Sequence, residues 1–107
     1  MTRQEILAKA RTIVCGQNEQ DYGSPDSNFN LIADLWSVYL GVDVTPLDVS
    51  MMMILLKTAG VKNGAGIESS MVDIAGYAAC GGEIVSMTDE MSVRINGENV
   101  VHLGSEN

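Results

Sequence analysis

Basic residues are scarce in this chain of 107 residues, where six Lys and Arg stand against fourteen Asp and Glu and give a net charge of −8 at pH 7. Nucleic-acid backbones and anionic membrane surfaces both attract proteins through Lys and Arg. The composition therefore disfavours nucleic acid and membranes as partners. It leaves a bound metal, a basic protein partner or simple solubility as reasons for the acidic charge.

Histidine and cysteine are also few, with one His and two Cys, and this disfavours a zinc site. Cys15 and Cys80 lack C-x-x-C spacing and lie in apolar helical stretches, so we interpret them as small, reduced core residues. His102 has no second metal ligand and no Ser or Cys placed for activation. We assign it no role.

Long hydrophobic runs are missing, because the longest, Val49–Leu56, is too short to span a bilayer and is interrupted by Ser50. The N-terminal sequence M-T-R-Q-E leads directly into an amphipathic helix and does not have the pattern of a signal peptide. We therefore expect a soluble, cytoplasmic protein.

The clearest signal that is present is a central helix. Thr45 can cap the first free amide groups, Pro46 suits the first helical position, and Asp48 is placed to complete a capping box. Gly60 is expected to end the helix, which the pattern therefore predicts over 46–59.

The apolar side chains of this central helix project in almost every direction around its axis, which is typical of a helix buried on every side. They are Val49, Met51, Met52, Met53, Ile54, Leu55 and Leu56. A chain of this length forms one small domain, and the remaining short helices can hardly enclose such a helix. We therefore expect a homo-oligomer; a compact monomer with a Met-rich core is the alternative.

Three further helices are predicted from start and stop signals: 3–15 after Thr2 and Glu5, 25–40 after Ser24 and Pro25, and 71–87 after Ser70 and Asp73. The stretch 61–69 between the last two predicted helices is expected to be a loop. Residues 1–87 are thus predicted to form an all-α domain resembling a four-helix bundle. Its bulky core residues are expected from the helix over 25–40, and its first helix is expected to bury one face formed by Ile6, Leu7, Ala10, Ile13 and Val14.

Glycines interrupt the last predicted helix at Gly76, Gly81 and Gly82, and each lowers helix propensity by about 1 kcal/mol relative to Ala. Small residues on one face allow another helix to approach closely, so we predict the tightest helix crossing here. The alternative is a break in the helix near Gly81.

The tail, 88–107, differs from the rest of the chain. Asn96 and Gly97 stand between two β-branched runs, which predicts a β-hairpin over 92–103. A lone hairpin is only marginally stable, so it must rest on the helices, pair with another chain or remain loose.

Carboxylates are the first candidates for chemistry. Helical bundles hold Mg²⁺ with several inward-facing carboxylates, usually in E-x-x-E or E-x-x-D repeats, and neither repeat occurs here. Asp73, Asp48 and Asp34 are the candidate metal ligands. We favour the other interpretations, in which Asp48 and Asp73 are capping acids and Asp34 lies on a solvated helix face. No cofactor is expected outside the magnesium alternative. Lys57 and Lys62 are expected to be solvated; the alternative is that they meet a phosphate near the end of the central helix.

The polar loop before the second helix is the other candidate site. Asp21, Tyr22 and Gly23 place an aromatic ring between an acid and a glycine, an arrangement that can stack on and hydrogen-bond a planar ligand. The alternative is that Tyr22 packs onto Phe29 or Trp36.

Four segments in order resemble a family of small, uncharacterised phage and prophage proteins, a domain of unknown function. They are D-Y-G-S-P-D-S-N-F, I-A-D-L-W-S-V-Y-L-G, T-P-L-D-V-S-M-M-M-I-L-L-K and V-D-I-A-G-Y-A-A-C-G-G-E. The resemblance covers roughly residues 1–87 and carries no established activity.

Val72–Tyr77 is also similar, more distantly, to a later helix of the all-α MazG-like nucleotide pyrophosphatases, which are helical oligomers that use Mg²⁺ on helix carboxylates. Of their ligands only Asp73 is matched, and their E-E-x-x-E motif is missing. We therefore favour an oligomeric phage binding or accessory protein that engages a protein partner or small ligand. A divergent Mg²⁺-dependent nucleotide hydrolase is the alternative.

Overall fold

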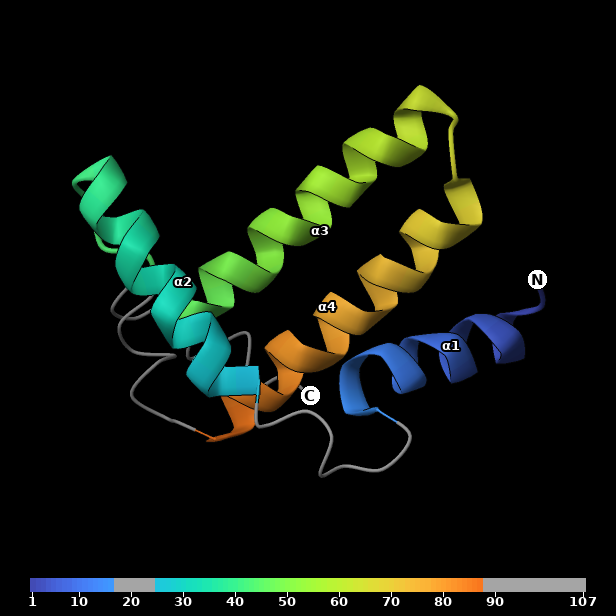
Figure 1. The fold of residues 1–107 in the computed structure, drawn as a ribbon, viewed down its shortest axis with the longest axis horizontal. Coiled ribbons are helices and arrows are strands. Elements are labelled where there is room, and N and C mark those ends of the chain that lie inside the picture. The colour runs from blue at the N-terminus through green and yellow to red at the C-terminus, as the bar shows by residue number, and fades with distance from the viewer. Residues whose placement is uncertain (17–24, 88–107) are drawn as a thin grey trace, which may run out of the picture.

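The computed structural model describes residues 1–16 and 25–87, and they form four α-helices (Figure 1). These are α1 (Arg3–Cys15), α2 (Pro25–Leu40), α3 (Pro46–Asn63) and α4 (Ile67–Met87). The predicted all-α class is confirmed for these residues, among which there is no strand. The hairpin predicted over 92–103 lies outside the described residues and stays a prediction.

The helices α3 and α4 form the centre of the fold as an antiparallel pair joined by a short turn (Figure 1). Helix α1 packs along α4 on the side away from α3. Helix α2 packs near the start of α3 and the end of α4, and it diverges from α3 toward its own C-terminal end (Figure 1). This arrangement leaves much of α3 with a neighbour on one side only.

Two helix starts are built as the sequence predicts. At α1 the Thr2 hydroxyl accepts the Glu5 amide at 3.1 Å, and the Glu5 carboxylate accepts the Thr2 amide at 2.8 Å. At α3 the same reciprocal pair joins Thr45 and Asp48, at 3.1 and 2.9 Å. Both capping boxes satisfy amides that have no partner inside the helix.

The predicted end of α3 is wrong. The helix continues through Gly60 to Asn63, and Gly64, with a φ of 86°, closes it in the left-handed conformation. A glycine inside a helix costs only about 1 kcal/mol, which tertiary packing can offset. Gly60 lies at such a packed position, because a Cβ added there would be 3.2 Å from the Ser70 hydroxyl oxygen.

The predicted start of α4 is also wrong, by one turn. The helix begins at Ile67, and Ser70 is a buried residue within the first turn whose amide donates to the Gly66 carbonyl at 2.9 Å. The predicted loop over 61–69 is therefore reduced to the residues between the two helices. Local propensity near helix ends is weak, so packing between α3 and α4 decides both boundaries.

The buried core lies where α2, α3 and α4 meet. It consists of Phe29, Ala33, Val44, Val49 and Ile84, with Ile32, Trp36, Leu47, Met53, Tyr77 and Cys80 packed against it. Helix α2 thus supplies Phe29 and Trp36 as predicted, but Tyr39 and Leu40 at its end are exposed. On α1, Ala10 is buried whereas Leu7 and Ile13 are exposed, so only part of the predicted apolar face is covered.

Two glycines of α4 mark close helix crossings, as predicted. A Cβ added to Gly76 would lie 2.9 Å from the Val14 side chain, and one added to Gly81 would lie 2.5 Å from the Ser50 hydroxyl oxygen. The Ser50 hydroxyl donates to the Tyr77 carbonyl at 2.6 Å across the α3–α4 contact. Helix α4 runs unbroken through both sites, so the alternative of a break near Gly81 is wrong.

Within the described part of the chain, none of the helices combines the length and apolar character needed to cross a membrane.

Candidate functional site

Two helices carry large apolar side chains that the single chain leaves exposed. The outer face of α2 is formed by Leu31, Leu35 and Val38, and the outer face of α3 by Met51, Met52, Leu55 and Leu56. Val38 is 83% exposed and Leu55 is 65% exposed. Scattered apolar residues are normal on a surface, but apolar residues gathered on a helix face indicate an interaction site.

Helix α3 is therefore not enclosed by the part of its own chain that the structure describes, as we expect for a single copy with so few short helices. The oligomer expected to complete its burial stays a prediction. Val49 and Ser50 face α4 and are almost fully buried, whereas Met51 and Leu55 lie on the opposite side. Among the described helices none covers this outer face, since α2 diverges from α3 (Figure 1).

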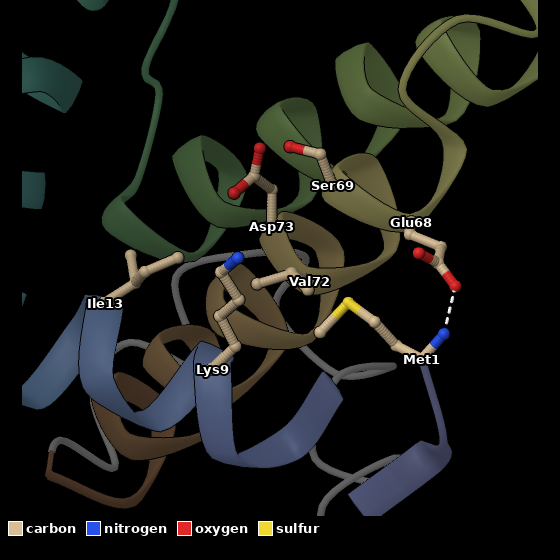
Figure 2. A pocket seen from close by; sticks show the side chains of 7 residues that line it. All are labelled: Met1, Lys9, Ile13, Glu68, Ser69, Val72 and Asp73. Atoms are coloured by element: carbon tan, nitrogen blue, oxygen red, sulfur yellow. Dashed lines mark hydrogen bonds and ion pairs between the residues drawn. The ribbon is translucent and has the colours of Figure 1, made fainter. Parts of the chain in front are cut away.

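A cleft lies between α1 and the first half of α4. Its volume is about 250 Å³, and it is lined by Met1, Lys9, Ile13, Glu68, Ser69, Val72 and Asp73. Figure 2 shows the Lys9 side chain reaching from α1 into the cleft, on the side where Asp73 projects from α4. Ile13 and Val72 give it an apolar wall, so the cleft presents an ammonium group, a hydroxyl and a carboxylate beside an apolar surface.

The charges of this cleft are largely balanced. Asp73 pairs with Lys57 of α3 at 3.1 Å, and the Met1 amino group pairs with Glu68 (Figure 2). Lys9 is exposed and makes no ion pair with any residue that the structure describes. The cleft thus combines the ammonium group of Lys9 with an Asp73 carboxylate that is already paired to Lys57.

The ion pair between Lys57 and Asp73 was not anticipated, because Lys57 was expected to be solvated. A signal was available in the sequence: Lys57 follows Val49 by eight residues and Met53 by four, which places it on the inward side of α3. The aliphatic part of a lysine can line such a face while its amino group reaches a carboxylate.

The three acids considered as metal ligands have separate surroundings. Asp73 is paired with Lys57, Asp48 completes the capping box of α3, and Asp34 is exposed on α2. Among residues 1–16 and 25–87, no three His, Cys, Asp or Glu side chains lie together in a group that could hold a metal ion. The magnesium alternative therefore has no assembled ligand set in the described part of the chain.

Replacing Asp73 by Asn is expected to lower the free energy of unfolding by less than about 1 kcal/mol, because partly exposed ion pairs contribute little. Its side chain and that of Lys57 are 28% and 33% exposed. Urea unfolding at fixed chain concentration measures the change, which should shrink in 1 M salt as the charges are screened. Glu83→Gln, an exposed acid on the same helix, is the control. A loss of several kcal/mol would contradict this assignment.

The two cysteines are free thiols, each partly buried. Burial raises the pKa of the Cys80 thiol, with smaller contributions from the negative charges of Glu83 and Cys15. A raised pKa lowers the fraction of the nucleophilic thiolate. This agrees with the interpretation of Cys80 as a core residue, and it packs against the buried cluster.

The candidate ligand loop, Asp21, Tyr22 and Gly23, lies outside the described residues, so its role in binding stays a prediction. Two features of the structure do not follow from the sequence pattern: the exposed apolar outer face of α2 and the cleft between α1 and α4. The spacing of Leu31, Leu35 and Val38 was visible, but apolar positions of a helix do not show which of them face the core.

Comparison with known proteins places the chain among phage sequences. Residues 5–85, more than half of the chain, match a family described as "Domain of unknown function (DUF6378)". The chain is 49% identical to the Gene 55 protein of Mycobacterium phage L5 over 74 residues, which cover 68% of this chain and 47% of that protein. It is 40% identical to the Gene 55 protein of Mycobacterium phage D29 over 77 residues, which cover 72% of this chain and 51% of that protein.

The chain thus spans about half the length of these two relatives. The resemblance to an uncharacterised phage family is confirmed. No solved structure matches the chain.

Proposed function

This chain belongs to the DUF6378 family of domains of unknown function, and we propose from its own surface that it acts as a homo-oligomeric binding or accessory protein of a phage. The observation that carries the proposal is the pair of exposed apolar faces on α2 and α3. In this view self-association covers those faces, and the assembled protein engages a protein partner or a small ligand.

The exposed side chains are numerous enough for a stable interface. Covering a Leu or Val side chain contributes about 1.5–3 kcal/mol, and a standard protein interface takes about 800 Å² from each partner. The seven large apolar side chains on the two faces each offer on the order of 100 Å², so together they come close to that size. Specific association is the ordinary way in which a small domain covers such a surface.

The binding part of the proposal rests on two places. Asp21, Tyr22 and Gly23 are separated from the start of α2 by Ser24 alone, and they can engage a planar ligand. The α1–α4 cleft offers Lys9 and Ser69 to a small anionic group. Both belong to each chain separately, so oligomerisation multiplies the sites and raises avidity for a partner that repeats along an assembly.

The first test is the mass in solution. Multi-angle light scattering at micromolar concentrations is expected to report more than one chain per particle. Leu55→Glu and Leu35→Glu should each shift the mass toward one chain, because an unpaired carboxylate buried in an apolar interface costs several kcal/mol. Both residues are more than half exposed in the single chain, so its fold should persist.

Asn30→Glu is the matched control, since it adds the same charge at an exposed position on α2 beside the apolar face. Its mass should equal that of the unmodified protein, and circular dichroism should show equal helix content in all variants. A well-folded, single-chain species at micromolar concentration would overturn the proposal.

Mg²⁺-dependent nucleotide hydrolysis is the competing function, and the same preparation can test it. The protein is incubated with canonical and modified nucleoside triphosphates and Mg²⁺ or Mn²⁺, and pyrophosphate release is measured. Turnover that disappears in Asp73→Asn would favour the hydrolase. Absence of turnover, together with no metal-dependent rise in melting temperature, would support the binding function.

A further inference from the structure

The outer face of α2 has the spacing of a helix that packs against another helix. Leu31, Leu35 and Val38 follow one another at intervals of four and three residues, which places them in one line along the helix. All three are exposed, and Asp34 lies beside them, three residues after Leu31 and four before Val38. The apolar line therefore carries one acid near its middle.

The outer face of α3 carries the opposite charge. Lys62 follows Leu55 by seven residues, which is two helical turns, so both lie on the same side of α3. Lys62 is exposed and makes no ion pair with a residue in the described ranges. Helix α2 contains no Lys or Arg, so of the helices α2 and α3 it is α3 on which a base lies beside exposed apolar residues.

These charges distinguish between the ways in which two copies can meet. Packing α2 against α2 of a second copy brings two acidic faces together and leaves the face of α3 uncovered. Packing α3 against α3 leaves Leu35 and Val38 in water. Packing α2 of each copy against α3 of the other covers both faces in both chains and places acid opposite base.

A two-fold axis produces this exchange twice, because each contact of an isologous dimer is repeated by symmetry. The exchange also covers more apolar surface than the two alternatives, because it uses both exposed faces of each chain, and a standard interface takes about 800 Å² from each partner. Helix α2 diverges from α3 of its own chain, which leaves the two faces available to a second copy rather than to each other (Figure 1).

We propose that two copies of this chain form a two-fold dimer in which α2 of each packs across α3 of the other, with Asp34 of one copy paired to Lys62 of its partner. The inference rests on the proposed self-association and adds to it the pairing of helices and the charges that select it. Charge pairs at the edge of an interface mainly determine which partner surface is accepted.

Charge exchange tests the pairing through the dimer dissociation constant, measured by analytical ultracentrifugation in 0.1 M salt. Asp34→Lys and Lys62→Glu should each weaken the dimer about tenfold, since each creates two like-charge contacts. The variant with both substitutions should return to within about threefold of the unmodified protein, because acid again faces base. Arg3→Glu, an exposed base on α1, is the control and should leave the constant unchanged.

A direct measurement uses a carbodiimide, which joins a carboxylate to a nearby amine with loss of water. In a mixture of ¹⁴N- and ¹⁵N-labelled chains, peptides linking Asp34 to Lys62 should carry both labels. If the protein is a dimer without this link, and the double variant dissociates as readily as the single variants, the pairing of Asp34 with Lys62 is wrong. The proposed self-association would then still stand. A dimer strengthened by Asp34→Asn would indicate α2 against α2. A monomeric unmodified protein would overturn the proposed function itself.

Discussion

Replacing Gly81 by alanine is expected to lower the free energy of unfolding by about 2 kcal/mol, although alanine is the better helix former. A Cβ at this position would lie 2.5 Å from the Ser50 hydroxyl oxygen and 3.1 Å from the Ser50 Cβ. Ser50 cannot move aside easily, because it is 1% exposed and its hydroxyl donates to the Tyr77 carbonyl. Overpacking a buried contact costs about 1–3 kcal/mol or more, which exceeds the gain of about 1 kcal/mol in helix propensity.

Gly82→Ala is the matched control, because it makes the same change one residue further along α4, where an added Cβ meets no atom within 4 Å beyond the neighbouring backbone of its own helix. It should stabilise the protein by up to about 1 kcal/mol. Urea unfolding followed by circular dichroism, at one chain concentration, gives both values. Equal shifts for the two variants would show that α3 and α4 do not cross closely at Gly81.

The second large effect is expected at Ile84, where truncation to alanine should cost about 3 kcal/mol. Its side chain is 1% exposed and packs in the cluster with Phe29, Ala33, Val44 and Val49. Removing these methyl groups forfeits their transfer from water and leaves a cavity where three helices meet, and Ile→Ala changes in cores cost about 2–5 kcal/mol.

Ile67→Ala makes the same chemical change on the same helix at a residue that is 45% exposed. It should cost less than about 1 kcal/mol, because little area is returned to water. The two unfolding midpoints, compared at constant m-value, measure the difference. If both variants lost similar stability, the core would not lie at the end of α4.

The starts of α1 and α3 were predictable because their determinants are local, whereas the start of α4 was not. The capping boxes of α1 and α3 each need two side chains three residues apart, and both pairs form as the sequence indicates. The end of α3 was not predictable in this way. Gly60 and Gly64 are both acceptable stops locally, and the contact of Gly60 with Ser70, ten residues away in the sequence, favours the later one.

In the candidate site, too, some contacts follow from the local sequence and others only from helix packing. That Asp48 caps α3 follows from its distance to Thr45, whereas the partner of Asp73 depends on how α3 packs against α4. The exposure of the apolar side chains on α3 also depends on how the helices pack. Periodicity indicates that Val49 and Leu55 are both apolar positions of one helix, but only the packing of the helices shows that Val49 is buried and Leu55 is not.

The sequence by itself determined the helical class, the helix starts at Thr2 and Thr45, and the small residues that permit close crossings on α4. The tertiary structure decided where α3 ends and α4 begins, which carboxylate pairs with which lysine, and which apolar faces remain uncovered. The reason is range. Caps and propensities act within one helical turn, whereas burial and ion pairing depend on helices that are distant in the sequence and meet only in the folded chain.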